Sequence, residues 1–164
     1  MEVTKRIARR IPSAAFFILL ALTFVRCNTD SVYSGMETLP ETGWASKKPA
    51  VFHASVNDTL GVHNVYVHLR HSGAYEFRNL FLFITTQSPA GATITDTLDV
   101  QLATPAGKWY GSGWGNLYDN KIPYKYQVRF PVTGKYTFRI VQGMRQDPLK
   151  HVTDVGLSIE QVKP

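Results

Sequence analysis

Residues 124–140 read Tyr-Lys-Tyr-Gln-Val-Arg-Phe-Pro-Val-Thr-Gly-Lys-Tyr-Thr-Phe-Arg-Ile, and apolar and polar side chains alternate on both sides of the Pro-Val-Thr-Gly segment. Alternation with a period of two residues is typical of a β-strand that buries one face. A proline and a glycine between two such runs are typical of a turn. We therefore expect two strands here that pair as a hairpin around residues 131–134.

The same alternation recurs along the chain. Apolar side chains occupy every second position through residues 65–69, 98–102 and 155–159. Residues 79–86 are apolar on both faces, which favours a central strand. No amphipathic helix is predicted after residue 27. About seven or eight short strands are enough for two packed sheets, so the expected fold is all-β, an antiparallel β-sandwich.

The first residues of the chain carry an export signal. Four cations precede the apolar run of residues 14–25, which has the length of a signal-peptide core and is too short for the ~20 residues of a membrane-spanning helix. The single cysteine, Cys27, follows this run by two positions, as in lipoproteins whose cysteine receives a diacylglyceryl group and an N-acyl chain. Arg26 departs from the small residue usual before such a cysteine, and a buried free thiol is the alternative.

These features divide the chain into three parts. We predict a lipoprotein signal peptide over residues 1–26, a lipidated cysteine with a flexible tether over residues 27–50, and a β-sandwich domain over residues 51–164. The tether prediction depends on the Gly, Pro, Ser and Thr residues of that segment and on its weak periodicity.

The basic charge of the chain belongs mainly to the signal. Lys and Arg total 18 and Asp and Glu total 12, for a formal net charge of +6. Residues 1–26 hold five of these cations and one of these anions, so 13 positive and 11 negative side chains remain after cleavage. The remaining net charge of +2 does not favour nucleic-acid binding. We expect no nucleic-acid partner.

Residues with catalytic or metal-binding chemistry are few. Four of the five histidines lie close together in the sequence, at His53, His63, His68 and His71, but no H-x-H or HExxH spacing is present. We interpret them as surface or loop side chains and predict no metal site, no catalytic residue and no cofactor other than the lipid on Cys27. A hydrolase would need a cleft in which a histidine meets a carboxylate or a hydroxyl.

A segment rich in glycine and aromatic residues spans residues 107–120. It contains Trp109, Tyr110, Trp114 and Tyr118. Exposed aromatic rings of this kind can stack on sugars or bind a protein partner. The other interpretation is that the rings close one end of the sandwich while the glycines form turns.

The carboxy-terminal third carries the most distinctive pattern. Residues 152–160 read Val-Thr-Asp-Val-Gly-Leu-Ser-Ile-Glu and follow the Gly-Lys-Tyr-Thr-Phe run of residues 134–138. Together with residues 75–84 and 107–113, they resemble the gliding motility lipoprotein GldH family. This resemblance covers most of residues 33–160. It implies an envelope lipoprotein of the gliding apparatus that is linked to adhesin export by the type IX secretion system.

The leading hypothesis is a non-enzymatic, lipid-anchored accessory or assembly component of that machinery. Its expected partners are a membrane, through the lipid on Cys27, and other gliding or secretion proteins of the envelope. The expected location is the cell envelope at the outer membrane, with the leaflet left open. The alternative is a surface carbohydrate-binding module that uses residues 107–120, and a hydrolase is a third hypothesis. The candidate partner or glycan surface comprises Trp109, Tyr110, Trp114, Tyr118, Arg139 and Arg145.

The two arginines of this set are also expected to form surface ion pairs. Arg139 and Arg145 lie close in sequence to Asp147 and Asp154. Such exposed pairs contribute only ~0–1 kcal/mol each. We interpret Asp154 and its neighbour Gly156 as structural first and as part of a partner surface second.

Overall fold

A computed structural model describes residues 31–163, so the predicted signal peptide and Cys27 lie outside the described residues. The described part contains eight strands and no helix, and hence no helical segment able to cross a membrane. The strands are β1 (Ser31–Thr38), β2 (Ala50–Val56), β3 (His63–Ser72), β4 (Asn79–Gln87), β5 (Thr93–Gln101), β6 (Leu117–Val128), β7 (Gly134–Gln142) and β8 (Val152–Gln161).

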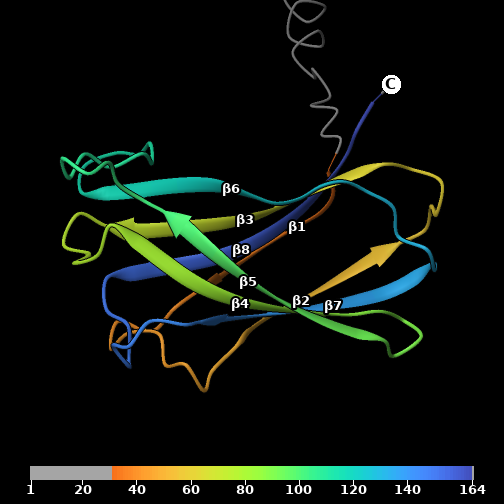
Figure 1. Ribbon diagram of the computed structural model, residues 1–164, viewed down its shortest axis with the longest axis horizontal. Coiled ribbons are helices and arrows are strands. Elements are labelled where there is room, and N and C mark those ends of the chain that lie inside the picture. The colour runs from red at the N-terminus through yellow and green to blue at the C-terminus, as the bar shows by residue number, and fades with distance from the viewer. Residues whose placement is uncertain (1–30, 164) are drawn as a thin grey trace, which may run out of the picture.

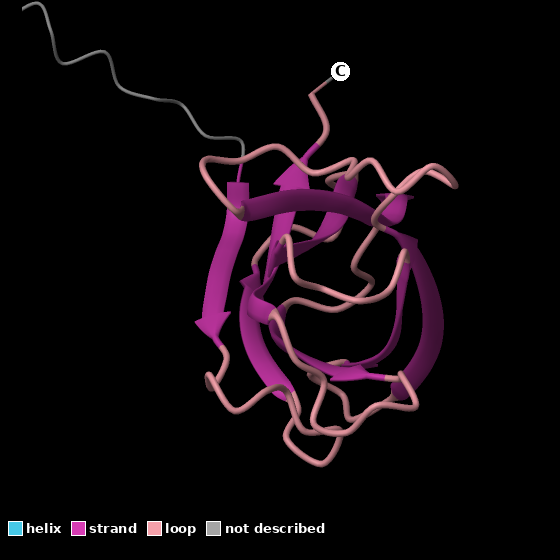
Figure 2. Ribbon diagram, turned by 90° about the vertical axis from the view of Figure 1, so that its left-hand side faces the viewer, coloured by secondary structure: helices cyan, strands magenta, loops and turns pink. Residues whose placement is uncertain are grey.

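The strands form two antiparallel sheets that pack face to face (Figures 1 and 2). One sheet has the order β1-β8-β3-β6 and the other the order β2-β7-β4-β5. This arrangement confirms the predicted all-β sandwich. Among the described strands, only β4 and β5 are sequence neighbours that also pair with each other.

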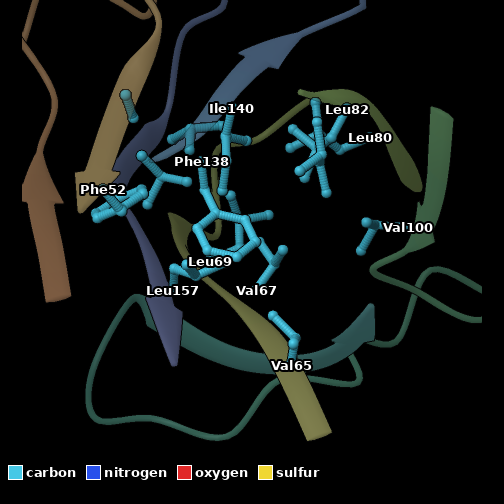
Figure 3. Packing of buried hydrophobic residues seen from close by; sticks show 14 of the residues in the cluster. Phe52, Val65, Val67, Leu69, Leu80, Leu82, Val100, Phe138, Ile140 and Leu157 are labelled. Carbon is cyan, nitrogen blue, oxygen red and sulfur yellow. The ribbon is translucent and has the colours of Figure 1, made fainter. Parts of the chain in front are cut away.

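The core lies between the sheets and is built from the alternating apolar positions. Val65, Val67 and Leu69 of β3 are buried, as their spacing predicted. They face side chains such as Phe52 and Phe138 of the opposite sheet (Figure 3). The period of two residues therefore reports correctly which face of β3 points inward.

The distinctive motif of residues 152–160 forms β8, an inner strand of its sheet. Every residue from Asp154 to Ile159 is buried. A Cβ atom added to Gly156 would lie 2.7 Å from the carbonyl oxygen of Gly35 on β1 and 2.9 Å from the sulfur of Met36. Gly156 therefore permits a close approach of two strands, in agreement with the structural interpretation of this motif.

The predicted hairpin of residues 124–140 is wrong. The two segments are indeed strands, but β6 pairs with β3 in one sheet and β7 pairs with β2 and β4 in the other. Phe130, whose position continues the alternation of β6, instead lies in the connection between the sheets. It is 6% exposed and packs against His63 and Tyr136. Local alternation identifies a strand but does not determine which sheet the strand joins.

The predicted tether is wrong from Ser31 onward. Residues 31–38 form β1, which pairs along its length with β8. Leu39 and Trp44 are 7% and 1% exposed, and Trp44 forms an antiparallel bridge with Leu149. Residues 31–50 therefore belong to the domain, which does not begin at residue 51. The segment has weak periodicity because β1 is an edge strand with much of its surface in solvent.

The loops gather at two ends of the sandwich (left and right in Figure 1). Loops 57–62, 88–92 and 129–133 lie at the right with the start of β1, and we call this the Ser31 end. At the left are the other four loops, and we call this the aromatic end. These loops comprise residues 39–49, 73–78, 102–116 and 143–151.

Candidate functional site

The aromatic end carries most of the predicted surface residues. The segment of residues 102–120 there is folded into two short turns closed by the bridges Ala103–Trp109 and Ser112–Asp119. The backbone N–H of Asp119 donates to the carbonyl of Ser112 at 2.7 Å. These contacts hold the aromatic side chains in defined positions.

Glycine is required inside this segment. Gly107 and Gly115 have φ angles of 83° and 64°, a region that disfavours a side chain. A Cβ atom at Gly113 would collide with the carbonyl oxygen of Leu117. The glycines therefore form turns, as one of the two interpretations of the sequence had it.

Trp109 and Tyr118 are half-buried in an aromatic cluster. Their rings contact the buried imidazole of His71, with centroid distances of 4.6 Å for Trp109 and 5.5 Å for Tyr118. Tyr75 completes the cluster at 5.6 Å from His71, and its hydroxyl donates to the carbonyl of Asn79. Burial raises the pKa of Tyr75. These rings close the end of the core, and Trp109 and Tyr118 are only partly exposed to a ligand.

Two aromatic side chains of the segment remain open to solvent. Tyr110 is 60% exposed and Trp114 is 96% exposed. Leu117, at the start of β6, is 40% exposed. An exposed tryptophan on a fixed turn is a typical anchor for a protein partner.

A cleft of about 490 Å³ opens between β5 and β6 beside Tyr110. Several polar side chains line it together with a few apolar ones. The hydroxyl, amide and carboxylate groups could form hydrogen bonds with a polar ligand, and the exposed phenol ring could stack on a sugar face. The polar lining residues are Asp99, Gln101, Ser112, Asp119, Asn120 and Lys121.

The two predicted arginines lie apart. Arg139 is exposed on the outer face of β7, where its register neighbours are Val51 and Thr85. Arg145 is exposed at the aromatic end, beside a hollow of about 440 Å³ that Phe81 and two other apolar side chains also line. The structure therefore places Arg145, but not Arg139, at the same end of the sandwich as the exposed Tyr110 and Trp114.

The expected ion pairs of these arginines are wrong. Both carboxylates are engaged elsewhere, because Asp147 accepts hydrogen bonds from Ser46 and Asp154 accepts one from Thr38. The hydroxyl of Ser46 lies 2.6 Å from Asp147, and this contact lowers the pKa of that carboxyl.

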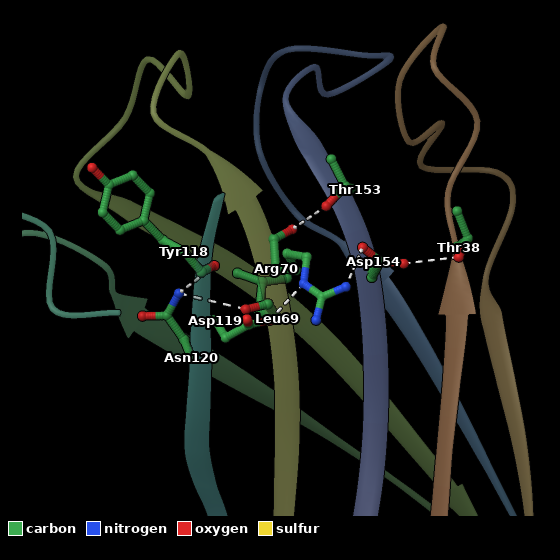
Figure 4. A network of polar contacts seen from close by, with 8 residues as sticks. All are labelled: Thr38, Leu69, Arg70, Tyr118, Asp119, Asn120, Thr153 and Asp154. Atoms are coloured by element: carbon green, nitrogen blue, oxygen red, sulfur yellow. Dashed lines mark hydrogen bonds and ion pairs between the residues drawn. The ribbon is translucent and has the colours of Figure 1, made fainter. Parts of the chain in front are cut away.

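Asp154 instead belongs to a row of polar side chains across the sheet (Figure 4). Arg70 lies between Asp154 at 3.6 Å and Asp119 at 2.6 Å. Thr38 donates to Asp154 from the edge strand at 2.8 Å. The row thus links all four strands β1, β8, β3 and β6. No local sequence pattern predicts this row, because its members lie up to 116 residues apart in the chain.

The histidines do not form a metal site within residues 31–163. Their interpretation as surface or loop side chains is wrong for two of them, since His63 is 1% and His71 is 0% exposed. Both lie at ends of β3, where the rings pack against aromatic side chains. An imidazole at a strand end can therefore serve as an aromatic core residue.

Within the described residues, two histidines contact a hydroxyl. Exposed His53 lies 3.1 Å from the hydroxyl oxygen of Thr137. The Nε2 atom of His68 lies 2.7 Å from the hydroxyl oxygen of Ser158 on the outer face of the sheet. Ser158 is only 3% exposed, and it lies on an inner strand whose neighbours are β1 and β3. Backbone N–H groups in such a strand are used in the ladders and cannot form an oxyanion hole beside the serine. The contact therefore does not favour the hydrolase hypothesis.

His71→Phe is expected to reduce the loss of stability on mild acidification. Burial lowers the pKa of His71, so the folded state keeps the ring neutral while the unfolded chain binds a proton below pH ~6.5. The stabilisation is complete above that pH and is lost as the pH falls toward the pKa of the folded state. Phenylalanine keeps the ring contacts but does not titrate.

The measurement is the melting temperature between pH 7.5 and pH 5, before most carboxylates titrate. Exposed His53 provides the matched control, and His53→Gln should keep the pH dependence of the parent. Burial also lowers the pKa of His68, which accounts for a remaining slope. An unchanged slope in His71→Phe would contradict this assignment.

Comparison with known proteins gives concordant matches. The sequence profile of the family described as GldH lipoprotein matches residues 31–159. The chain is 32% identical over 156 residues to the "Gliding motility lipoprotein GldH homolog" of Christiangramia forsetii, covering 91% of this chain and 95% of that protein. It is also 32% identical over 159 residues to the "Gliding motility lipoprotein GldH" of Flavobacterium johnsoniae, covering 93% and 98% respectively.

Proposed function

The chain belongs to the GldH lipoprotein family, and from this we propose that it is a lipid-anchored, non-enzymatic accessory subunit of the gliding and type IX secretion machinery. The names of its relatives support a lipoprotein that takes part in gliding motility. The family match runs from β1 into β8 and so includes residues of all eight described strands. We further propose the outer membrane as its location, because the type IX system exports adhesins to the cell surface.

The observation that carries this proposal is the placement of the exposed aromatics relative to the anchor. Cys27 precedes the first strand by four positions, so a lipid there would hold the domain close to the membrane. Trp114 and Tyr110 belong to loop 102–116, which lies at the opposite end of the sandwich. An anchored domain that displays aromatic side chains away from its anchor is suited to capture partners in the envelope, since tethering raises their effective concentration.

Trp114 is expected to cross-link to other envelope proteins. In cells of the source organism, a photoreactive phenylalanine analogue at position 114 should capture components of the gliding or secretion machinery, identified by mass spectrometry. The same analogue at exposed Thr97, on the outer face of β5, is the matched control and should capture fewer of them. Trp114→Ala should reduce colony spreading and adhesin export without changing the amount of protein in the membrane. Equal capture at positions 114 and 97 would argue against this surface.

The cleft between β5 and β6 supports carbohydrate binding as a second candidate function. Its polar lining and the exposed ring of Tyr110 are the chemistry that a sugar ligand needs. Binding on a glycan array that is lost in Tyr110→Ala would favour this function over assembly. Trp109→Ala is a poor test, because that ring packs in the aromatic cluster and its removal would also disturb the fold.

A further inference from the structure

The Ser31 end joins the described domain to the proposed anchor. Ser31 pairs with Glu160 there, at the edge of the sheet. Cys27 precedes Ser31 by four positions, so a fully extended chain between them spans at most about 14 Å. The aromatic end lies a further ~30 Å away along the ten residues of β3. A lipid on Cys27 would therefore hold the Ser31 end close to the bilayer.

Large apolar side chains are exposed at this end. Leu60 in loop 57–62 is 83% exposed, and Ile94 at the start of β5 is 66% exposed. Val132 in loop 129–133 is 39% exposed, and Tyr126 near the end of β6 is 61% exposed. Exposed single apolar residues are ordinary, but several of them at one end of a domain indicate a surface that is covered in the working molecule.

An apolar hollow lies beside Ile94 at this end. Arg129 donates a hydrogen bond from Nε to the carbonyl of Leu60 at 3.3 Å, which places loop 129–133 against loop 57–62. Arg129 also lines a hollow of about 280 Å³ whose other wall includes Ile94. The surface thus extends from Leu60 past Arg129 to Ile94. Apolar side chains of this hollow include Val128, Phe130, Pro131 and Tyr136.

Two cations at this end have no ion-pair partner among the described residues, while one of the acids there is paired with a lysine. Arg129 and Lys135 are exposed and have no ion pair among residues 31–163. Asp96 is paired with Lys125 at 3.1 Å. Asp58 accepts a backbone N–H of its own loop at 2.8 Å. This hydrogen bond lowers the pKa of Asp58, so its carboxylate stays charged, but the two unpaired cations outnumber it. The unpaired charge that flanks the apolar side chains is therefore positive on balance.

We propose that the lipoprotein stands end-on on an anionic bilayer surface, with Leu60, Ile94 and Val132 inserted at the headgroup boundary and Arg129 and Lys135 against the lipid phosphates. Apolar side chains flanked by cations bind such an interface in peripheral membrane proteins. The proposal rests on the lipid anchor of the proposed function. Its consequence is a fixed orientation in which the aromatic end points away from the bilayer toward partners.

The test uses the full lipoprotein reconstituted in vesicles of phosphatidylethanolamine and phosphatidylglycerol. Because the lipid blocks the thiol of Cys27, a nitroxide label can be attached to one introduced cysteine at a time. Leu60→Cys and Val132→Cys report on the Ser31 end. Trp114→Cys reports on the aromatic end, and Met36→Cys, 52% exposed on β1, reports on the sheet face. Circular dichroism checks that each variant is folded.

The readout is the collision rate of each label with oxygen, which concentrates in lipid, and with a water-soluble nickel chelate. Labels at positions 60 and 132 should show a ratio of oxygen to nickel collisions several-fold higher than labels at positions 36 and 114. Water-like ratios at positions 60 and 132 would overturn the proposal. So would a deeper label at position 36, because the domain would then lie on its sheet face.

Two further outcomes distinguish a failure of the end-on docking from a failure of the proposed function. If the wild-type protein does not float with the vesicles, the anchor is absent and both proposals fail. The protein could instead float while the labels at positions 60 and 132 are protected from the nickel chelate in native envelopes but not in vesicles. A protein then covers this end, and the end-on docking alone fails. With docking correct, the double change Arg129→Glu and Lys135→Glu should return the label at position 60 toward water while flotation persists.

Discussion

Trp44→Ala is expected to lower the free energy of unfolding by about 3–5 kcal/mol. The indole is 1% exposed, and its Nε1–H donates to the carbonyl of Lys48 at 2.9 Å. The backbone of Trp44 also exchanges two hydrogen bonds with Leu149 at the aromatic end. Removal of the ring leaves a cavity beside these bonds and exposes part of the core. A residue in a flexible tether would show no such effect.

The measurement is urea unfolding of the chain from residue 28, followed by circular dichroism because the mutation removes a fluorophore. Glu41→Ala is the matched control, since Glu41 is exposed in the same segment and its loss should cost less than about 0.5 kcal/mol. An unchanged midpoint for Trp44→Ala would restore the tether interpretation of residues 39–49.

Cys27→Ala is expected to abolish incorporation of a labelled fatty acid into the protein. Without the thiol, no diacylglyceryl group can be attached, and the precursor that retains residues 1–26 should migrate more slowly on a gel. Each buried methylene contributes ~0.8 kcal/mol to membrane affinity, so two or three acyl chains hold a protein firmly while their absence releases it. With residues 1–26 exchanged for a cleavable secretory signal, Cys27→Ala protein should appear in the soluble fraction.

Asn28→Ala is the control for this experiment, because it changes the neighbouring residue and keeps the cysteine. It should incorporate the label like the wild-type protein. A wild-type protein that takes up no fatty acid, or a Cys27→Ala protein that still does, would remove the anchor from the proposed mechanism. Arg26→Gly supplies a second readout, since a small residue before the cysteine should speed processing.

Residues 79–86 show how much can be predicted from a segment that is apolar on both faces. The segment is an inner strand, as its apolar character predicted, and its inward side chains are fully buried at Leu80 and Leu82. The outward Phe81 and Phe83 are 38% and 42% exposed, because only one face of the sheet packs against the other sheet. The sequence shows that an apolar residue lies on the outer face. It does not show whether another part of the protein covers that residue.

The candidate surface was only partly predictable, because the exposure of its side chains also depends on distant segments. Its segment stands out by composition, so Trp109 and Trp114 were both named from the sequence. Trp109 closes the core because it packs against His71, whereas Trp114 is 96% exposed. Nothing in the local sequence distinguishes the two rings. The contact depends on the end of β3 meeting the segment after β5, which no local pattern contains.

Local sequence patterns predicted most of the strands after residue 50, the all-β class and the position of the proposed anchor, because alternation, turn residues and the signal pattern are properties of neighbouring residues. The tertiary structure alone decided the sheet that each strand joins, the inclusion of residues 31–50 in the domain and the partners of Asp154. These outcomes depend on contacts between distant segments, such as Trp44 with Leu149 and Thr38 with Asp154. Sheet membership and strand pairing depend on segments far apart in the chain, so local periodicity cannot encode them.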